Sequence, residues 1–310
     1  MAALTKIKKK RKFFNLQTRR DIIGWAFVFP AFSMFGVFVL APIMIALVAG
    51  FSDFNGIDYF GRWGLQNYRH IFTEDRFRFI LSLRNLIFYV LLFVPLNLII
   101  SFVIAILASG KNRSKKYFRL AFYIPALTSG VAVGAVWSWL LNPQAGIINE
   151  SLRALGITNP PNWTNNPNLT IVVITIVSLW GGTAVNMVLF VAAIHGVNES
   201  LIEAARIEGA GRLRIVIFII IPLISPITYF VVTTVFIGAF QLFDPVMMVF
   251  GDGGGPQMRA LTPIMVINRT ANTLFYGLGS AMSTILLAIV LVLTNIIQFF
   301  SRKINRGVDA

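Results

Sequence analysis

Apolar residues in this chain gather into six long runs that contain no charged side chain. We place the runs at 24–48, 86–108, 120–141, 169–194, 217–243 and 277–299. Each run has at least about 20 residues, enough for an α-helix to cross the ~30 Å hydrocarbon core of a membrane. The spans must be helical because lipid offers no hydrogen-bond partners to the backbone. The pattern predicts an all-α polytopic membrane protein with six transmembrane helices.

Proline and amide side chains interrupt these apolar runs. Proline removes a backbone donor, so we expect kinks at Pro30, Pro42, Pro95, Pro125, Pro222 and Pro226. The amides within the runs are Asn97, Asn186, Gln241 and Asn295. An unpaired amide in hydrocarbon is costly, so these side chains should face protein or water. Helix–helix hydrogen bonding is one interpretation, and a solute path lined by Asn97, Asn186, Gln241 and Asp244 is the other.

Basic residues in the connecting segments predict the orientation of the chain. With the N-terminus in the cytoplasm, the inner segments 1–23, 109–119, 195–216 and 300–310 hold 19 of the 27 Lys and Arg residues. The three outer segments hold the remaining 8. We therefore expect both termini, and the segment 195–216, on the cytoplasmic side.

The same pattern divides the chain into four parts. They are a basic N-terminal segment (1–23), a first span with an outer segment (24–85), a five-helix core (86–299) and a short tail (300–310). The basic segment is not a removable signal peptide, because the apolar run after it is too long and no small-residue cleavage site follows. It is either a disordered cytoplasmic tail or a segment that lies on anionic headgroups.

Composition supports the membrane class and removes several functions. The chain is 56% hydrophobic and 13% charged, against about 25% charged residues in soluble domains. It has no cysteine, and its two histidines lie far apart, so no metal site is expected. A net charge of +15 could suggest nucleic acid. The basic residues are concentrated in the predicted cytoplasmic segments, so we expect no nucleic-acid partner.

The polar segment 196–226 is more elaborate than a membrane loop needs. Ser200 and Glu203 have the spacing of a capping box, in which each side chain bonds the other's backbone amide. Glu203 and Arg206 are spaced to pair on the helix that follows. Gly209 and Gly211 then end that helix. On spacing alone the segment is equally an ordinary interfacial helix.

The letters of this segment resemble a known family. IEAARIEGAGRLRIVIFIIIPLISP is similar to the EAA motif of permease subunits in binding-protein-dependent ABC importers, in the carbohydrate-uptake (maltose-type) branch. Glu208 stands where that branch commonly has Asp. The block from Phe118 to Leu152 and the GDGGGPQMRALT segment also resemble this family. In it, this loop is the coupling helix that docks on the ATPase. The resemblance assigns that role to Ser200, Glu203, Ala204, Ala205, Glu208 and Gly209.

The resemblance also implies an assembly and a cargo. It implies the ABC type I importer permease fold, a second homologous permease subunit, two ATPase subunits, an extracytoplasmic solute-binding protein and a sugar or oligosaccharide cargo at the cytoplasmic (inner) membrane. ATP and Mg would bind the ATPase subunits, because this chain has no P-loop and no cofactor site. Alternatives are a self-sufficient secondary transporter, disfavoured by the lack of charge within the runs, and a membrane anchor or receptor.

The last outer segment, 244–272, holds a turn that is poor in side chains. Gly253, Gly254, Gly255 and Pro256 follow one another there. Such a turn lets another backbone approach closely. We therefore expect this segment to help receive the binding protein. The alternative is a plain connector, for which about 30 residues is long.

Overall fold

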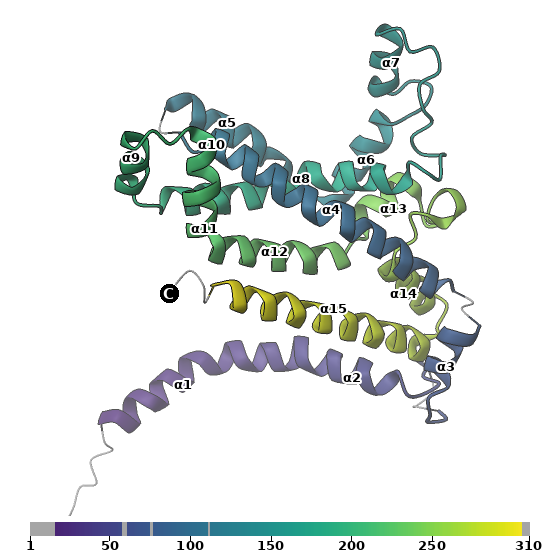
Figure 1. Ribbon diagram of the computed structural model, residues 1–310. Helices are drawn as coiled ribbons and strands as arrows, with labels where there is room; N and C mark the ends of the chain where they lie inside the picture. Colours follow the sequence, from purple (N-terminus) through teal and green to yellow (C-terminus); the bar gives the residue numbers. More distant parts are fainter. Residues whose placement is uncertain (1–15, 58–60, 75–76, 111, 306–310) are drawn as a thin grey trace, which may run out of the picture.

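The computed structural model describes residues 16–57, 61–74, 77–110 and 112–305, and this part of the chain is helical without a β-strand (Figure 1). The α-helices are α1 (Leu16–Phe35), α2 (Ala41–Ala49), α3 (Gln66–Thr73), α4 (Phe79–Ala108), α5 (Arg113–Tyr123), α6 (Gly130–Leu140), α7 (Ile147–Ala154), α8 (Thr170–His195), α9 (Glu199–Ile207), α10 (Arg212–Ile215), α11 (Ile221–Leu223), α12 (Ser225–Phe240), α13 (Asp244–Phe250), α14 (Pro263–Asn272) and α15 (Tyr276–Asn305). Two π-helices, η1 (Gly36–Leu40) and η3 (Val216–Ile220), and two 3₁₀-helices, η2 (Ile124–Leu127) and η4 (Pro256–Met258), complete the order. The predicted all-α class is confirmed.

Four helices in the described ranges are long and apolar enough to cross a membrane. They are Arg20–Ala49, Phe79–Ala108, Thr170–His195 and Tyr276–Phe299. Two further crossings exist only if each of two bent helix pairs counts as one span. The six predicted runs therefore correspond to four continuous helices and two broken ones.

The third run, 120–141, differs from a single straight helix. Arg113–Leu127 and Gly130–Leu140 meet at an angle of 100°. Pro125 cannot donate a backbone hydrogen bond, and Ser129 starts a new helix by accepting the amide of Ala132 at 3.3 Å. α6 has 11 residues, which is about 16 Å of helix and too short to cross alone.

The fifth run is bent as well, by 74° between Arg212–Leu223 and Ser225–Phe240. Pro222 and Pro226 flank this bend. A π-turn precedes the first proline, because the Ile221 amide donates to Val216 five residues earlier. The same π-turn precedes Pro42. The helix continues past Pro42 to Ala49, whereas past Pro222 it ends at Leu223, so the wider turn alone does not decide whether the helix bends. α1 and α4 continue through Pro30 and Pro95.

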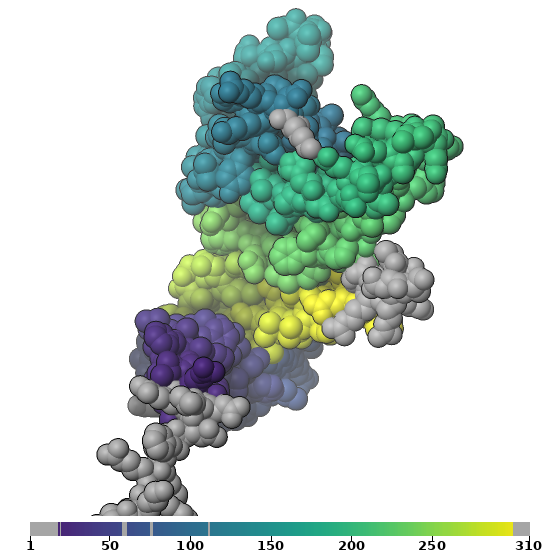
Figure 2. Space-filling model, turned by 90° about the vertical axis from the view of Figure 1, so that its left-hand side faces the viewer, coloured from purple at the N-terminus to yellow at the C-terminus, as the bar shows by residue number. Residues whose placement is uncertain are grey.

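The core lies where α4 packs along α8, with α12 against α4 and α15, and α2 against α15. Gly182 lets α4 and α8 approach, since a Cβ there would lie 3.2 Å from the Asn97 side chain and 3.3 Å from Phe93. α1 and α2 form the outermost layer, drawn purple beside the yellow α15 in Figure 2. The span Arg20–Ala49 buries none of its most apolar window within the chain.

The predicted loop 244–272 is a structured hairpin of helices. α13 packs against α6, and α14 packs against α15 and α4. Val246, Leu261, Met265 and Val266 are buried there. Residues 244–272 are less apolar than a membrane span, but their apolar residues recur at helical spacing. That spacing could have predicted the two helices. The segment is therefore an ordered pair of helices, and its predicted role in receiving the binding protein stays a prediction.

Some predictions concern residues outside the described ranges. The basic segment 1–23 is described only from residue 16, and the tail 300–310 only to residue 305. Their placement relative to a lipid surface stays a prediction, as does the cytoplasmic orientation of both termini.

Candidate functional site

The segment with the coupling-helix pattern forms α9. Its N-cap is Asn198, whose side-chain oxygen accepts the amide of Ser200 at 3.1 Å. The predicted capping box of Ser200 and Glu203 is therefore wrong. Asn caps a helix as well as Ser does. Because Asn198 is the N-cap of α9, Ser200 lies inside the first turn of this helix. No ion pair joins Glu203 to Arg206 in this helix, where both side chains are exposed.

The end of α9 is a complete Schellman motif. Gly209 donates to the Arg206 carbonyl at 3.0 Å, and Ala210 donates to the Ala205 carbonyl at 2.9 Å. Gly209 has φ +83, a left-handed conformation that glycine adopts without steric cost. The elbow predicted at Gly209 is present, and it directs the chain into α10, which begins after Gly211.

The two faces of α9 differ. Ile202 and Ala205 pack against the hydrophobic core, whereas Glu203, Ala204 and Glu208 are exposed. Ile207 and Leu213 are 88% and 72% exposed, although both are large and apolar. Exposed apolar side chains grouped with charges are typical of a protein-binding surface. Ala205 belongs to the inward face, so a docked partner would meet Ala204 instead.

A second candidate site is an open cleft of about 660 Å³ between α4, α6, α8 and α12. The four residues singled out from the sequence as path candidates all line it. They are Asn97, Asn186, Gln241 and Asp244. Four side chains from distant parts of the sequence thus converge on one cleft.

Asn97 and Asn186 form the floor of this cleft and join α4 to α8. The Asn186 amide nitrogen donates to Asn97 Oδ1 at 2.8 Å and to the Gly182 carbonyl at 3.0 Å. Ser101 donates to the Thr183 carbonyl at 3.2 Å one turn away. Asn97 is fully buried, and its Nδ2 has no hydrogen-bond partner. Buried donors without a partner are rare, and such a donor is typical of a place that holds a ligand or water.

Gln241 and Asp244 lie at the other end of the cleft. Gln241 ends α12 and is exposed. Asp244 starts α13 and lies against the first residue of α6, since a Cβ on Gly130 would be 3.1 Å from the Asp244 Cβ. Asp244 is the one charged residue among the described residues that line the cleft.

The remaining lining residues were not singled out from the sequence. They include hydroxyls and aromatic rings, namely Tyr89, Phe93, Thr128, Ser178, Phe230, Thr234 and Phe243. Tyr89 and Phe93 stack at 5.0 Å between ring centroids. A signal was available, because Asn85, Tyr89, Phe93, Asn97 and Ser101 recur every four residues along one face of α4.

The glycine turn of 251–255 closes on the chain itself. Gly254 and Gly255 have φ +73 and +68, and a Cβ on Gly254 would lie within 3.0 Å of Leu261 backbone atoms. The Asn85 side chain holds the turn by donating to the Met258 carbonyl at 2.8 Å. Gly253 is exposed, and no atom lies within 4 Å of an added Cβ there.

Residues 86–307 match the family model described as a binding-protein-dependent transport system inner membrane component. The chain is 30% identical over 285 residues to the probable ABC transporter permease protein YesP of Bacillus subtilis (strain 168), covering 90% of each. It is 28% identical to the lactose transport system permease protein LacF of Rhizobium radiobacter, covering 93% of this chain and 97% of LacF.

A solved structure has the same fold. It is described as a bacterial ABC transporter involved in the import of the acidic polysaccharide alginate. The TM-score is 0.77 at 20% sequence identity, and the match covers 93% of this chain and 98% of that one. At this identity the likeness concerns the fold alone.

Proposed function

The chain belongs to the family of binding-protein-dependent transport system inner membrane components, and we propose that its cleft is part of the path of a sugar or oligosaccharide. It is a multi-pass permease subunit of an ABC importer, as the sequence predicted, and its fold is the one predicted for such permeases. The ATPase of such a system is a separate subunit. The secondary-transporter alternative finds no support.

The convergence of Asn97, Asn186, Gln241 and Asp244 on one cleft carries this proposal. Amides and hydroxyls exchange hydrogen bonds with sugar hydroxyls, and the rings of Tyr89 and the phenylalanines offer flat apolar faces. Pockets with apolar walls and a few placed polar groups are typical of small-molecule sites. The Nδ2 of Asn97 is a donor without a partner, buried beside this cleft. A relative named for lactose transport agrees with this chemistry.

The cleft needs a second subunit to become a closed path. Leu127, Val185 and Phe230 are apolar, exposed and next to it or lining it. We infer that a second permease covers this side, whether it is a different chain or a second copy. The cargo would arrive from an extracytoplasmic binding protein, as the family's description implies.

A chain of helices connects the cleft to α9. Gly209 turns the chain from α9 into α10, π-helix η3 and the bend at Ile224 follow, and α12 then supplies one wall of the cleft. We infer that ATPase subunits, which bind ATP and Mg, dock on the exposed face of α9. Their closure would displace α9 and, through this bent helix, move the wall between outward and inward access.

The hairpin 251–258 remains our candidate for binding-protein docking. Gly254 and Gly255 pack against other residues of this segment. A docking partner would therefore contact Gly253 and Pro256. Asp252 is fixed beside them by an ion pair to Arg269 at 2.8 Å. A rigid, exposed turn loses little conformational entropy when a partner docks.

Reconstitution tests the proposed function. The permease would be assembled with its partner permease and ATPases in proteoliposomes, and the binding protein would be screened against a panel of glycans, amino acids and phosphorylated polyols. We expect a glycan-loaded binding protein to stimulate ATP hydrolysis and glycan uptake. Stimulation by a different solute class, with no glycan active, would overturn the carbohydrate assignment.

A further inference from the structure

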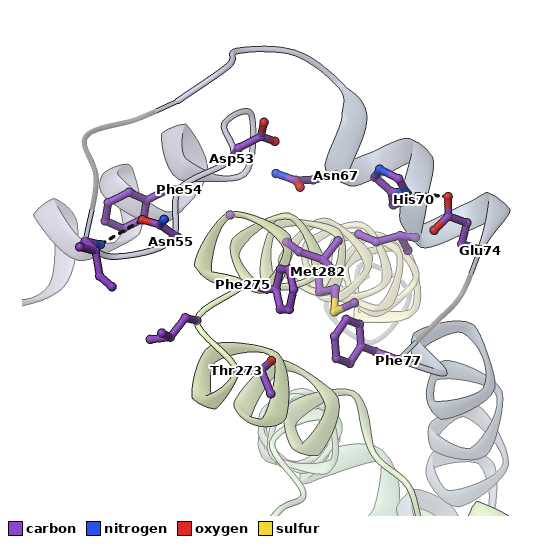
Figure 3. Close-up of a pocket in the computed structure, with 15 residues that line it drawn as sticks. Asp53, Phe54, Asn55, Asn67, His70, Glu74, Phe77, Thr273, Phe275 and Met282 are labelled. Atoms are coloured by element: carbon purple, nitrogen blue, oxygen red, sulfur yellow. Dashed lines mark hydrogen bonds and ion pairs between the residues drawn. The ribbon is translucent and has the colours of Figure 1, made fainter.

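A second cavity lies apart from the proposed path, between the segment that follows α2 and the start of α15 (Figure 3). Its volume is about 480 Å³. The segment with Asp53, Asn67, His70 and Glu74 covers it, and Phe275 and Met282 contribute from the α14–α15 side. None of the transport roles proposed above uses this cavity.

Tight contacts fix the wall of this cavity. The Gly277 amide donates to the Phe54 carbonyl at 2.8 Å, and a Cβ on Gly277 would overlap the Ser52 carbonyl oxygen at 2.1 Å. The Asn67 side chain donates to the carbonyls of Gly50 and Ser52 at 3.1 and 2.8 Å. The covering segment is thus held to the first turn of α15, and the cavity is a built feature of the fold.

The two sides of the cavity differ in chemistry. Asp53 and Glu74 place carboxylates on the covering side, with Glu74 3.0 Å from His70. Asp53 has only a long, exposed contact to Arg62 at 3.9 Å. Apolar side chains line both sides: Phe54, Ile57 and Ile71 belong to the covering side, whereas Leu274, Phe275, Leu278 and Met282 lie on the α14–α15 side, where Thr273 is the polar lining residue. No Lys or Arg is among the 15 described residues that line the cavity.

The cavity lies where three predicted spans leave the membrane. α2 ends at Ala49, α4 begins at Phe79 and α15 begins at Tyr276, and Figure 1 places α3 beside these helix ends. A ligand in this cavity meets apolar side chains on the side of the spans and carboxylates on the covering side. This arrangement matches an amphiphile with a cationic head.

Leu274 adds an independent observation. It has φ +62 and occupies the left-handed position of a Schellman motif that ends α14, where Phe275 donates to Thr270 at 3.1 Å. Glycine is preferred at such a position because a Cβ is strained there. The leucine side chain nevertheless lines the cavity, and it is 48% exposed. The strain at Leu274 is thus not offset by burial of its side chain within this chain.

We propose that this cavity binds a phospholipid with a primary-ammonium headgroup, the ammonium against the carboxylate of Asp53 or of Glu74 and an acyl chain against Leu274, Leu278 and Met282. Among the described residues Asp53 contacts only Arg62, at 3.9 Å, and Glu74 only His70, at 3.0 Å, so an ammonium would add a charge-assisted hydrogen bond to either carboxylate. A purely anionic lipid would meet two like charges there. The site lets the outer segment sense the headgroup composition of the surrounding leaflet.

The test uses the assembled transporter in detergent, titrated with phosphatidylethanolamine or phosphatidylglycerol and followed by native mass spectrometry. Leu274→Gly removes the side chain and relieves the strain, so the complex should keep or gain thermal stability while phosphatidylethanolamine affinity falls about fivefold. Asp53→Asn with Glu74→Gln should lower that affinity about tenfold. Glu150→Gln is the matched control, because Glu150 is also ion-paired on a helix and similarly exposed, 58% against 61%.

Two results would overturn the proposal. In the first, the wild-type complex binds both lipids with equal affinity, and neither Leu274→Gly nor the double carboxylate substitution changes that affinity. The other is a Leu274→Gly complex with unchanged lipid affinity but reduced stimulation by the binding protein, which would make the cavity a protein-docking site. The experiment measures lipid binding, so the outcome for this proposal does not depend on the carbohydrate assignment.

Discussion

The amide nitrogen of Asn186 lies 2.8 Å from the side-chain oxygen of Asn97 and joins the middle of α8 to the middle of α4. The two positions are 89 residues apart in the chain. This bond satisfies the Asn97 oxygen and leaves its nitrogen without a partner beside the cleft. The sequence left open whether these amides join helices or line a path, and the geometry accommodates both roles at once.

Removing the Asn186 amide should therefore weaken both packing and transport. In Asn186→Ala the buried Asn97 oxygen loses the closer of its two donors and keeps only the Ser101 hydroxyl at 3.4 Å, at a cost of about 1–3 kcal/mol. We expect a lower thermal midpoint of the purified complex and slower uptake. Asn295→Ala is the control, because Asn295 is exposed and bonds only the Leu291 carbonyl of its own helix. Equal midpoints for the two variants would contradict the structural role.

The Gly209 elbow should transmit the movement of the ATPases. Valine at this position would strain the left-handed backbone by about 1–3 kcal/mol and shift α9 relative to α10. We expect Gly209→Val to abolish the stimulation of ATP hydrolysis by loaded binding protein, while cargo binding by the soluble binding protein is unchanged.

Gly156→Val is the matched control for that variant. Gly156 ends α7 in the same motif with φ +91, and it also has open space around an added Cβ. The two variants should lose similar stability, and only the Gly209 variant should lose coupling. Normal stimulated hydrolysis in Gly209→Val would remove α9 from the coupling mechanism.

Substitutions at two glycines of the 251–255 turn should affect folding and docking separately. Gly254→Ala places a Cβ within 3.0 Å of Leu261 at φ +73, so we expect a destabilisation of at least about 1 kcal/mol. Gly253→Trp adds a large side chain to open space. It should assemble and keep basal hydrolysis but lose stimulation by the binding protein. Wild-type stimulation in Gly253→Trp would reduce the turn to a connector.

Much of the fold could be predicted because membrane spans obey a simple rule of length and polarity. The runs that became α4, α8 and α15 were placed from the absence of charge alone. The breaks at Ser129 and Ile224 could not be placed in this way, because proline at 30 and 95 leaves its helix continuous. Whether a proline bends a helix depends on caps and neighbours that hydropathy does not encode.

The candidate site was predictable in part for a similar reason. The cost of burying an amide indicated Asn97, Asn186 and Gln241, and the structure places them on one cleft. The partner of each amide depends on the register of α4 against α8, which only packing determines. The cap of α9 was misassigned because Asn198 and Ser200 both suit an N-cap, and local spacing does not choose between them.

Reversible blocking of the cleft tests the central claim most directly. The chain has no cysteine, so Gln241→Cys offers a single thiol at the exposed end of the cleft, and a bulky, charged methanethiosulfonate reagent can obstruct that end. Ile99→Cys is the control, because Ile99 lies on α4, is 59% exposed and does not line the cleft. The complex would be modified in detergent, where both thiols are accessible, and mass spectrometry would verify complete modification of each before reconstitution into proteoliposomes.

The measurement is ATP-driven uptake of the cargo by these proteoliposomes before modification, after it, and after reduction of the mixed disulfide. If the cleft is the path, uptake by the Gln241→Cys transporter falls at least about tenfold on modification and returns on reduction, while the Ile99→Cys transporter is unaffected. Undiminished uptake by fully modified Gln241→Cys would contradict the account, because a cargo that is not slowed by an obstructed cleft takes another route.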